Sequence, residues 1–230
     1  MKAKAIEHLE ELRARIIIVA AFFSFAFILG MALSPVIIQK IISDMSISNI
    51  TLVSLTPLEF IHTQLKIGFF SALLISSPMI IYQLIAFIKP GAKRTELAAV
   101  KYTLPSIFVF FISGAAFGYI IFTKIALRFL AHLSSLADIQ NMWSLNTFIS
   151  FILISSVSLG ILFELPVVLL LLKYLNLVNE KILSRKRKHV YVSIFILAAI
   201  ITPPDVITQV MISLPVILLY EVSLAIIKFL

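Results

Sequence analysis

Residues 194–207 read IFILAAIITPPDVI, an apolar run that stops at a Thr-Pro-Pro-Asp turn and then resumes at once. The run before the turn covers only 190–201, and the run after it covers 206–227. Twelve helical residues rise about 18 Å, well short of the ~30 Å hydrocarbon core of a bilayer. The pattern predicts either a short hairpin in a locally thinned bilayer or a re-entrant pair. Both place polar backbone at or below the membrane surface, a cost that usually marks function. The residues concerned are Pro203, Pro204 and Asp205.

The composition of the rest of the chain is that of a membrane protein. Of 230 residues, 61% are hydrophobic and 13% are charged, and the mean hydropathy is +1.11. Soluble domains are nearer half apolar and a quarter charged, so this chain has too little polar surface to face water on all sides. We predict an all-α integral membrane protein with six transmembrane helices in a single domain, residues 1–230. The four further spans are expected at 16–38, 60–88, 100–122 and 147–172.

Basic residues gather on alternate connections between these spans. Fifteen of the nineteen Lys and Arg residues lie in the N-terminal segment, the second-to-third and fourth-to-fifth connections, and the C-terminus. The exceptions are Lys40, Lys124, Arg128 and Lys66, of which Lys66 lies inside the second span and could snorkel. Because basic loops stay in the cytoplasm, both termini are predicted to be cytoplasmic, and six spans satisfy this bias where five do not. Sizeable external loops are expected at 39–59 and 123–146.

Glu164 stands inside the fourth span, in the sequence ILFELP, with no charged residue nearby. An ionised carboxylate in lipid costs at least a few kcal/mol, so this one should be protonated, paired or facing a wet cavity. Pro166 cannot bond the carbonyl of Leu162, which predicts a kink beside the carboxyl. Gln209 lies one helical turn after Asp205 and is the expected partner of Glu164 if spans four and six touch. The plainer alternatives are a Glu164 satisfied by a neighbouring helix and an Asp205 that only caps the last helix.

Further carboxylates lie among basic residues at the predicted cytoplasmic surface. Glu11 belongs to HLEELR before the first span, and Glu96 follows the second span in KPGAKRTE. Carboxylates there could accept a guanidinium in a bidentate bond. The local alternative, which the residues alone favour, is that Glu11 pairs with Arg15 and that Glu96 caps the third helix. Glu221 is expected to pair with a basic residue at the inner surface.

The sequence lacks the usual signatures of catalysis. It contains no HExxH, GxSxG or P-loop motif, and no glycine-rich array to cradle a phosphate. The absence of cysteine excludes disulfides, thiolate zinc sites, iron–sulfur clusters and a cysteine nucleophile. We therefore expect no enzyme activity, no metal and no cofactor.

Short motifs follow one another over nearly the whole chain. They are HLEELR (8–13), TP (56–57), SPMIIYQ (77–83), FIKPG (87–91), Glu96, FGY (117–119), FELP (163–166), ITPPDV (201–206) and Gln209. Each motif is weak alone, but the ordered set with this topology resembles the TatC family, the multispanning core of the twin-arginine protein translocase. The resemblance implies a glove-like, concave bundle of six helices in the plasma membrane, with short fifth and sixth helices.

The resemblance also implies a role for particular residues. Export signals with paired arginines would bind at the cytoplasmic face, with Glu96 as the main carboxylate. The other residues matching the recognition site are Glu11, Arg13 and Phe87. Within the membrane, Glu164 matches the intramembrane glutamate of the family, with Gln209 as its polar companion in the concave face.

Partners and driving force follow from the same resemblance. Single-span subunits of the TatA and TatB kind, an oligomeric assembly and folded cargo are implied, and no nucleic acid. Because no nucleotide motif is present, the proton-motive force is the expected driving force. Two other classes fit some of the residues. A secondary transporter also uses an intramembrane glutamate and broken helices, although no internal repeat is evident. A purely structural assembly subunit is the third possibility.

Overall fold

The structure is a computed structural model that describes residues 2–45, 50–88, 94–136, 140–174, 178–202 and 205–229. The chain is helical over most of these residues, as predicted. The helices are α1 (Lys2–Asp44), α2 (Glu59–Ile88), α3 (Arg94–Phe117), a π-helical turn (Gly118–Phe122), α4 (Thr123–Ser135), α5 (Leu145–Leu162), α6 (Leu165–Tyr174), α7 (Glu180–Arg185), α8 (Arg187–Ile201) and α9 (Val206–Phe229). The strands are β1 (Ile50–Val53) and β2 (Asn141–Ser144).

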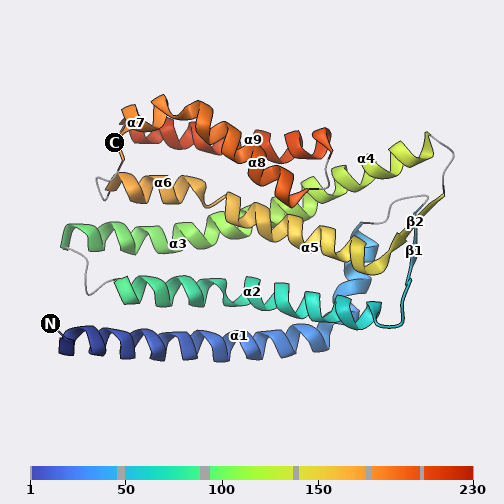
Figure 1. Ribbon diagram of the computed structural model, residues 1–230, viewed down its shortest axis with the longest axis horizontal. Helices are drawn as coiled ribbons and strands as arrows, with labels where there is room; N and C mark the ends of the chain where they lie inside the picture. The colour runs from blue at the N-terminus through green and yellow to red at the C-terminus, as the bar shows by residue number, and fades with distance from the viewer. Residues whose placement is uncertain are drawn as a thin grey trace.

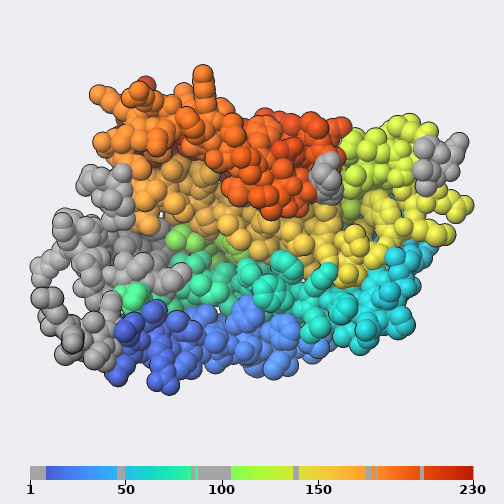
Figure 2. Space-filling view, in the orientation of Figure 1, coloured from blue at the N-terminus to red at the C-terminus, as the bar shows by residue number. Residues whose placement is uncertain are grey.

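The long helices lie side by side with their axes roughly parallel (Figure 1). α1 packs against α2, α3 packs against α5, and α8 packs against α9. Both ends of the chain lie at one end of the bundle, together with the ends of α2 and α6 and the starts of α3 and α7, and we call this the terminal end (Figure 1). The strands lie at the opposite end, the strand end. In the space-filling view, α1 and α2 follow one side of the molecule, and α7 and α8 (orange) follow the other (Figure 2).

Five segments are helical, long and apolar enough to cross a membrane: Leu9–Asp44, Glu59–Gln83, Pro105–Ser135, Leu145–Tyr174 and Val206–Phe229. α8 has 15 residues and rises only about 22 Å, as expected from its short apolar run. α9 has 24 residues and is a full-length candidate span, so the expectation of a short sixth helix is wrong. The mainly apolar run after the turn is long enough for a full span, and the helix continues through Pro215.

The fourth predicted span is broken in the middle. α5 ends at Leu162, α6 begins at Leu165, and Pro166 follows directly. The N–H of Glu164 bonds the carbonyl of Ile161 over 3.1 Å, a tighter turn than the α-helical pattern. This confirms the break predicted from Pro166, which cannot supply the hydrogen bond that the helix needs there.

Helices extend into both predicted external loops, and the second loop is largely helical. α1 continues to Asp44, and α4 fills 123–135 after the π-helical turn. The extra residue of that turn is accommodated because the Thr123 hydroxyl donates to the Gly118 carbonyl over 2.7 Å. α4 turns Ala126, Leu127 and Ala131 inward at helical spacing, so its apolar face continues the helix beyond the apolar run. The prediction of a loop at 123–135 was wrong because it considered only the length of the apolar run and not the apolar face of a helix.

A two-stranded parallel sheet closes the strand end, although no strand was predicted. Ile50 aligns with Asn141 and Val53 with Ser144. Each strand follows a helix that reaches this end and precedes one that returns, so the two run in the same direction. A cluster of buried side chains lies beneath the sheet, and it includes Ile38, Ile41, Met45, Ile67, Phe148, Ile149 and Ile152.

Candidate functional site

Arg15 connects α1 to α2 at the terminal end. Its Nε and Nη2 atoms donate to Oε1 of Glu11 over 3.1 and 2.6 Å. Its Nη1 donates to Oε1 of Gln83 over 2.9 Å, and Nη2 also donates to the carbonyl of Ala86 over 3.3 Å. The predicted pairing of Glu11 with Arg15 is therefore confirmed. The bonds to α2 were not predicted, and they hold the carboxylate beside the end of that helix.

The other predicted recognition residues are placed to different extents. Arg13 lies two residues before Arg15 on α1 and is exposed. Phe87 is half-buried and directly follows Ala86, whose carbonyl accepts from Arg15. The structure thus brings Glu11 and the segment of Phe87 to one place. Glu96 belongs to the first turns of α3, and its side chain lies outside the described residues.

Glu164 lies at the break between α5 and α6, and both of its carboxyl oxygens are buried. Among the described residues, no donor meets either oxygen with hydrogen-bond geometry, and the α3 backbone at Phe111 is the group that faces the carboxyl. A buried polar group without a partner is rare and costly, because it has given up its bonds to water. Both carboxyl oxygens of Glu164 can therefore still accept a hydrogen bond.

Glycines bring α3 against this break. A Cβ added to Gly114 would lie 2.6 Å from the Leu159 carbonyl oxygen and 2.6 Å from the Cβ of Phe163. A Cβ on Gly160 would lie 3.1 Å from the carbonyl oxygen of Phe111. These distances leave no room for a side chain without a shift of the backbone. The missing side chains let two helices enclose the Glu164 carboxyl and exclude water from it.

Gln209 does not pair with Glu164, contrary to expectation. Its Nε2 donates to the carbonyl of Phe195 over 2.9 Å and so ties α9 to α8. Spans four and six do touch, since α6 packs against α9, but Gln209 points to the other neighbour. Asp205 accepts from the N–H of Thr208 over 2.8 Å, which confirms the capping alternative. Pro203 and Pro204 lie outside the described residues.

Sequence reasoning missed a buried carboxylate at the strand end. Glu59 is 4% exposed. Its Oε2 accepts from the N–H groups of Leu55 (2.6 Å) and Thr56 (3.4 Å), and its Oε1 accepts from Ser144 Oγ (2.5 Å) and the N–H of Asn146 (2.9 Å). The signal was available: Thr56-Pro57-Leu58-Glu59 has the spacing of a capping box before an apolar run.

Lys66 and Glu59 share a hydrogen-bond partner, Asn146. Its Nζ donates to Oδ1 of Asn146 over 2.8 Å and to Oγ of Ser150 over 2.7 Å. The ammonium is thus held against α5, and the snorkelling suggested for Lys66 stays a prediction. Polar acceptors one turn apart on α5 satisfy it inside the bundle. We call Glu59, Lys66, Ser144, Asn146 and Ser150 the strand-end clamp.

At the terminal end, Glu221 of α9 accepts from two groups of α8. The Nη2 of Arg187 lies 2.9 Å from Oε2, and the Tyr191 hydroxyl donates to Oε1 over 2.6 Å. The predicted pairing of Glu221 with a basic residue is confirmed.

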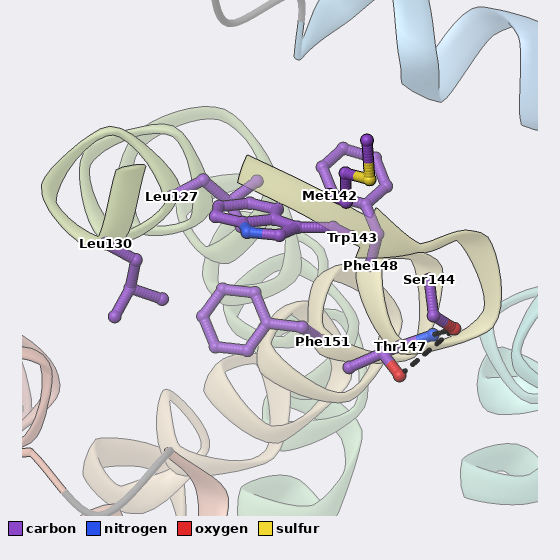
Figure 3. Close-up of a pocket in the computed structure, with 8 residues that line it drawn as sticks. All are labelled: Leu127, Leu130, Met142, Trp143, Ser144, Thr147, Phe148 and Phe151. Carbon is purple, nitrogen blue, oxygen red and sulfur yellow. Dashed lines mark hydrogen bonds between the residues drawn. The ribbon is translucent and has the colours of Figure 1, made fainter. Parts of the chain in front are cut away.

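A pocket of about 330 Å³ opens between α4, β2 and α5 at the strand end. Figure 3 shows Trp143, Phe151, Leu127 and Leu130 around this space, with Ser144 and Thr147 at its rim. Among the described residues, no ionisable side chain lines it. In the described part of the chain, no three His, Cys, Asp or Glu residues are grouped to hold a metal.

Apolar helices long enough to cross a membrane, one of them broken beside the buried Glu164 carboxyl, define a multispanning membrane protein. The family model described as "Sec-independent protein translocase protein (TatC)" matches residues 7–215, and the chain belongs to this family. It is 30% identical to TatCy of Bacillus subtilis over 97% of this chain and 88% of that protein. It is 34% identical to TatC of Carboxydothermus hydrogenoformans over 97% of this chain and 92% of that protein.

The fold matches experimental structures of the same family. A crystal structure of the twin-arginine translocase receptor TatC in DDM superposes with a TM-score of 0.85 at 33% identity, and the match covers 96% of this chain and 99% of that one. A second crystal structure of the twin-arginine translocase receptor TatC gives a TM-score of 0.84. The chain is therefore similar, over nearly its whole length, to multispanning components of the Sec-independent translocase.

Proposed function

We propose that this chain is the signal-recognising core subunit of a twin-arginine translocase. In this proposal it binds the paired arginines of export signals at its cytoplasmic face. With single-span partners of the TatA and TatB kind, in an oligomeric assembly, it exports folded proteins under the proton-motive force. Membership of the Sec-independent translocase family and similarity to a translocase receptor support this function.

The proposed orientation places the terminal end in the cytoplasm. The basic segments of the chain belong to the termini and to the two connections at that end. Basic segments remain on the cytoplasmic side of a bacterial membrane. The chain is then a single domain that crosses the plasma membrane six times as a glove-like bundle. α8, which is too short for an ordinary bilayer, makes the fifth crossing.

One observation carries the recognition proposal: Glu11 already holds a guanidinium at the terminal end. A carboxylate that accepts two N–H groups of an internal arginine has the position and exposure to accept those of an incoming one. Arg13 and Phe87 lie on the two helix segments that this contact joins. Glu96, at the start of the neighbouring helix α3, is proposed as the main carboxylate for the signal.

Within the membrane, we assign the Glu164 carboxyl to a later step of transport. A buried acid without a hydrogen-bond donor destabilises the fold, and ionisable groups inside membranes usually have a functional role. A polar group of a single-span partner would supply the missing donor. Gln209 and Asp205, with Pro203 and Pro204, are proposed to shape the short α8–α9 hairpin beside it.

Local thinning of the bilayer around α8 is part of the proposal. Inserting four leucines after Ile196 lengthens α8 by about 6 Å and removes the mismatch. We expect export to fall while the protein still inserts and folds. Four leucines inserted into the middle of α1, which is already long enough, serve as the control. Unchanged export with the longer α8 would remove thinning from the mechanism.

Photo-crosslinking tests the recognition proposal directly. A photoreactive amino acid placed at Thr95 or Leu97 of the intact protein is expected to capture a twin-arginine signal peptide. The same peptide with paired lysines should be captured far less, and Glu96→Ala should abolish the difference. A proton-coupled carrier or a scaffold would ignore both peptides. Capture that is equal for both peptides and survives Glu96→Ala would show the assignment to be wrong.

A further inference from the structure

The Arg15 contact is more than an ordinary pair along one helix. Three nitrogens of one guanidinium make four hydrogen bonds, two to Glu11 and two to the end of α2. An exposed arginine four residues from a glutamate usually meets only that partner. Here the group is held from both sides, so the position of its guanidinium over the Glu11 carboxylate is fixed.

This guanidinium is also the chemical group that an arginine signal presents. We propose that Arg15 is an internal competitor for the signal, so that binding at Glu11 exchanges one guanidinium for another. The inference rests on the proposed function and adds to it a residue that sets the affinity of the site. An incoming side chain must then bind Glu11 more favourably than Arg15 does before it can replace Arg15 there.

The geometry allows this exchange. The Arg15 and Glu11 side chains are 24% and 34% exposed, so an approaching group reaches the pair without opening the bundle. Such partly exposed pairs are weak, worth at most about 1 kcal/mol. When Arg15 releases Glu11, it keeps the Gln83 amide oxygen and the Ala86 carbonyl as acceptors. Its charge is therefore not left without partners, which lowers the cost of the exchange.

The same geometry discriminates arginine from lysine. A guanidinium offers a planar set of donors that matches a carboxylate, whereas an ammonium is a compact and strongly hydrated point charge. An incoming arginine restores the two bonds that Glu11 loses. An incoming lysine has to displace a better donor than itself and gains less. Because either side chain must displace Arg15, the internal arginine weakens both by the same factor: the preference for arginine belongs to the Glu11 carboxylate, and Arg15 sets how tightly any signal is held.

Equilibrium binding to the full-length protein in lipid nanodiscs tests this idea. The probes are a peptide with two adjacent arginines before an apolar segment and its paired-lysine counterpart. Arg15→Gln removes the competitor and should lower the dissociation constant of the arginine peptide by up to about fivefold. This is the change expected from losing a partly exposed ion pair such as Arg15–Glu11. Binding of the lysine peptide should tighten by the same factor, because both peptides displace the same competitor, so the arginine-to-lysine ratio stays unchanged. The control is Gln83→Leu, which cuts one bond between Arg15 and α2 but leaves the Glu11 pair, and it should tighten neither.

The outcomes separate this inference from the proposed function. If the wild-type protein does not prefer the arginine peptide, or Glu11→Gln leaves that preference intact, recognition at Glu11 fails and the inference fails with it. If the wild type prefers arginine through Glu11 but Arg15→Gln binds no tighter, only the inference is overturned, and Arg15 is a brace between helices. Should Arg15→Gln fold poorly, Arg15→Lys replaces it. This variant keeps the charge but is a weaker competitor, and unchanged or weaker binding of the arginine peptide overturns the inference.

Discussion

The strand end and the terminal end each hold a glutamate bound by several donors, but the donors differ in kind. Glu59 is 4% exposed and accepts from three backbone N–H groups and the Ser144 hydroxyl. Glu11 is 34% exposed and accepts from the long side chain of Arg15. Backbone donors are fixed by the fold, whereas a side-chain donor can rotate away. The first carboxylate is part of the structure, and the second can exchange its partner.

Glu164 completes this comparison between the two ends. Its oxygens are as well buried as those of a structural acid, yet no described donor serves them. The three acids form a series from fully bonded, through exchangeable, to unbonded. The series suggests that the donors around a carboxylate, more than its burial, distinguish a structural acid from a functional one in this bundle.

Loss of Glu59 should have the largest effect on stability. Glu59→Ala leaves buried donors from both β1–α2 and β2–α5 without an acceptor. We expect the unfolding temperature in detergent to fall by roughly 5–10 °C, because several unpaired groups remain in the interior. Glu59→Gln keeps one acceptor oxygen, so its unfolding temperature should lie between those of the wild type and Glu59→Ala. Glu10→Ala, on the exposed face of α1, is the control. If the unfolding temperature falls no more than it does for the control, the strand-end clamp does not stabilise the fold.

Glu164→Gln should affect export and not stability. The amide has nearly the same shape but cannot exchange a proton in the same way, so export by membrane vesicles is expected to fall at least tenfold if proton exchange is used. The unfolding temperature should stay within a few degrees of wild type, because no described hydrogen bond is lost. Full export by the variant would show that the later step of transport does not require the Glu164 carboxyl.

Glu11→Gln should weaken binding of an arginine-pair peptide about three- to tenfold, since a charge-assisted bond becomes a neutral one. Glu10→Gln, one position away and exposed, should bind as wild type does. Equal losses in both variants would indicate a general effect of charge on the peptide, with no specific site at Glu11.

Lys66→Met should have the smallest effect. The apolar side chain fits a membrane span, but Asn146 and Ser150 lose their donor. We expect the unfolding temperature to fall by about 2–4 °C, with signal binding unchanged. An increase in stability would mean that the buried ammonium costs more than its two bonds return, as some buried charges do.

Features with a local cause could be predicted from the sequence. Pro166 predicted the break in span four because proline disrupts a helix wherever it lies within one. The pairs of Glu11 with Arg15 and of Asp205 with Thr208 depend on residues three or four apart. Glu221 needed only a basic residue at the same end, and Arg187 provided it.

Features that join distant segments could not be predicted in this way. Glu59 and Ser144 are 85 residues apart, and Arg15 and Gln83 are 68 apart. The β1–β2 pairing has the same character, since neither four-residue segment is a strand without the other. Gln209 was assigned to the wrong neighbour because the face that α9 turns toward α8 depends on packing and not on spacing. Spacing predicts which residues share a helix face, but not which helix covers that face.

The most direct test of the account compares two variants in a single assay. The affinity of a twin-arginine peptide is measured for wild type, Glu11→Gln and Glu59→Gln in nanodiscs, at a temperature at which all three are folded. If exchangeable donors mark the functional acid, Glu11→Gln loses affinity severalfold, and Glu59→Gln binds like wild type despite its lower unfolding temperature. Equal affinities for all three proteins, or a loss confined to Glu59→Gln, would contradict the account.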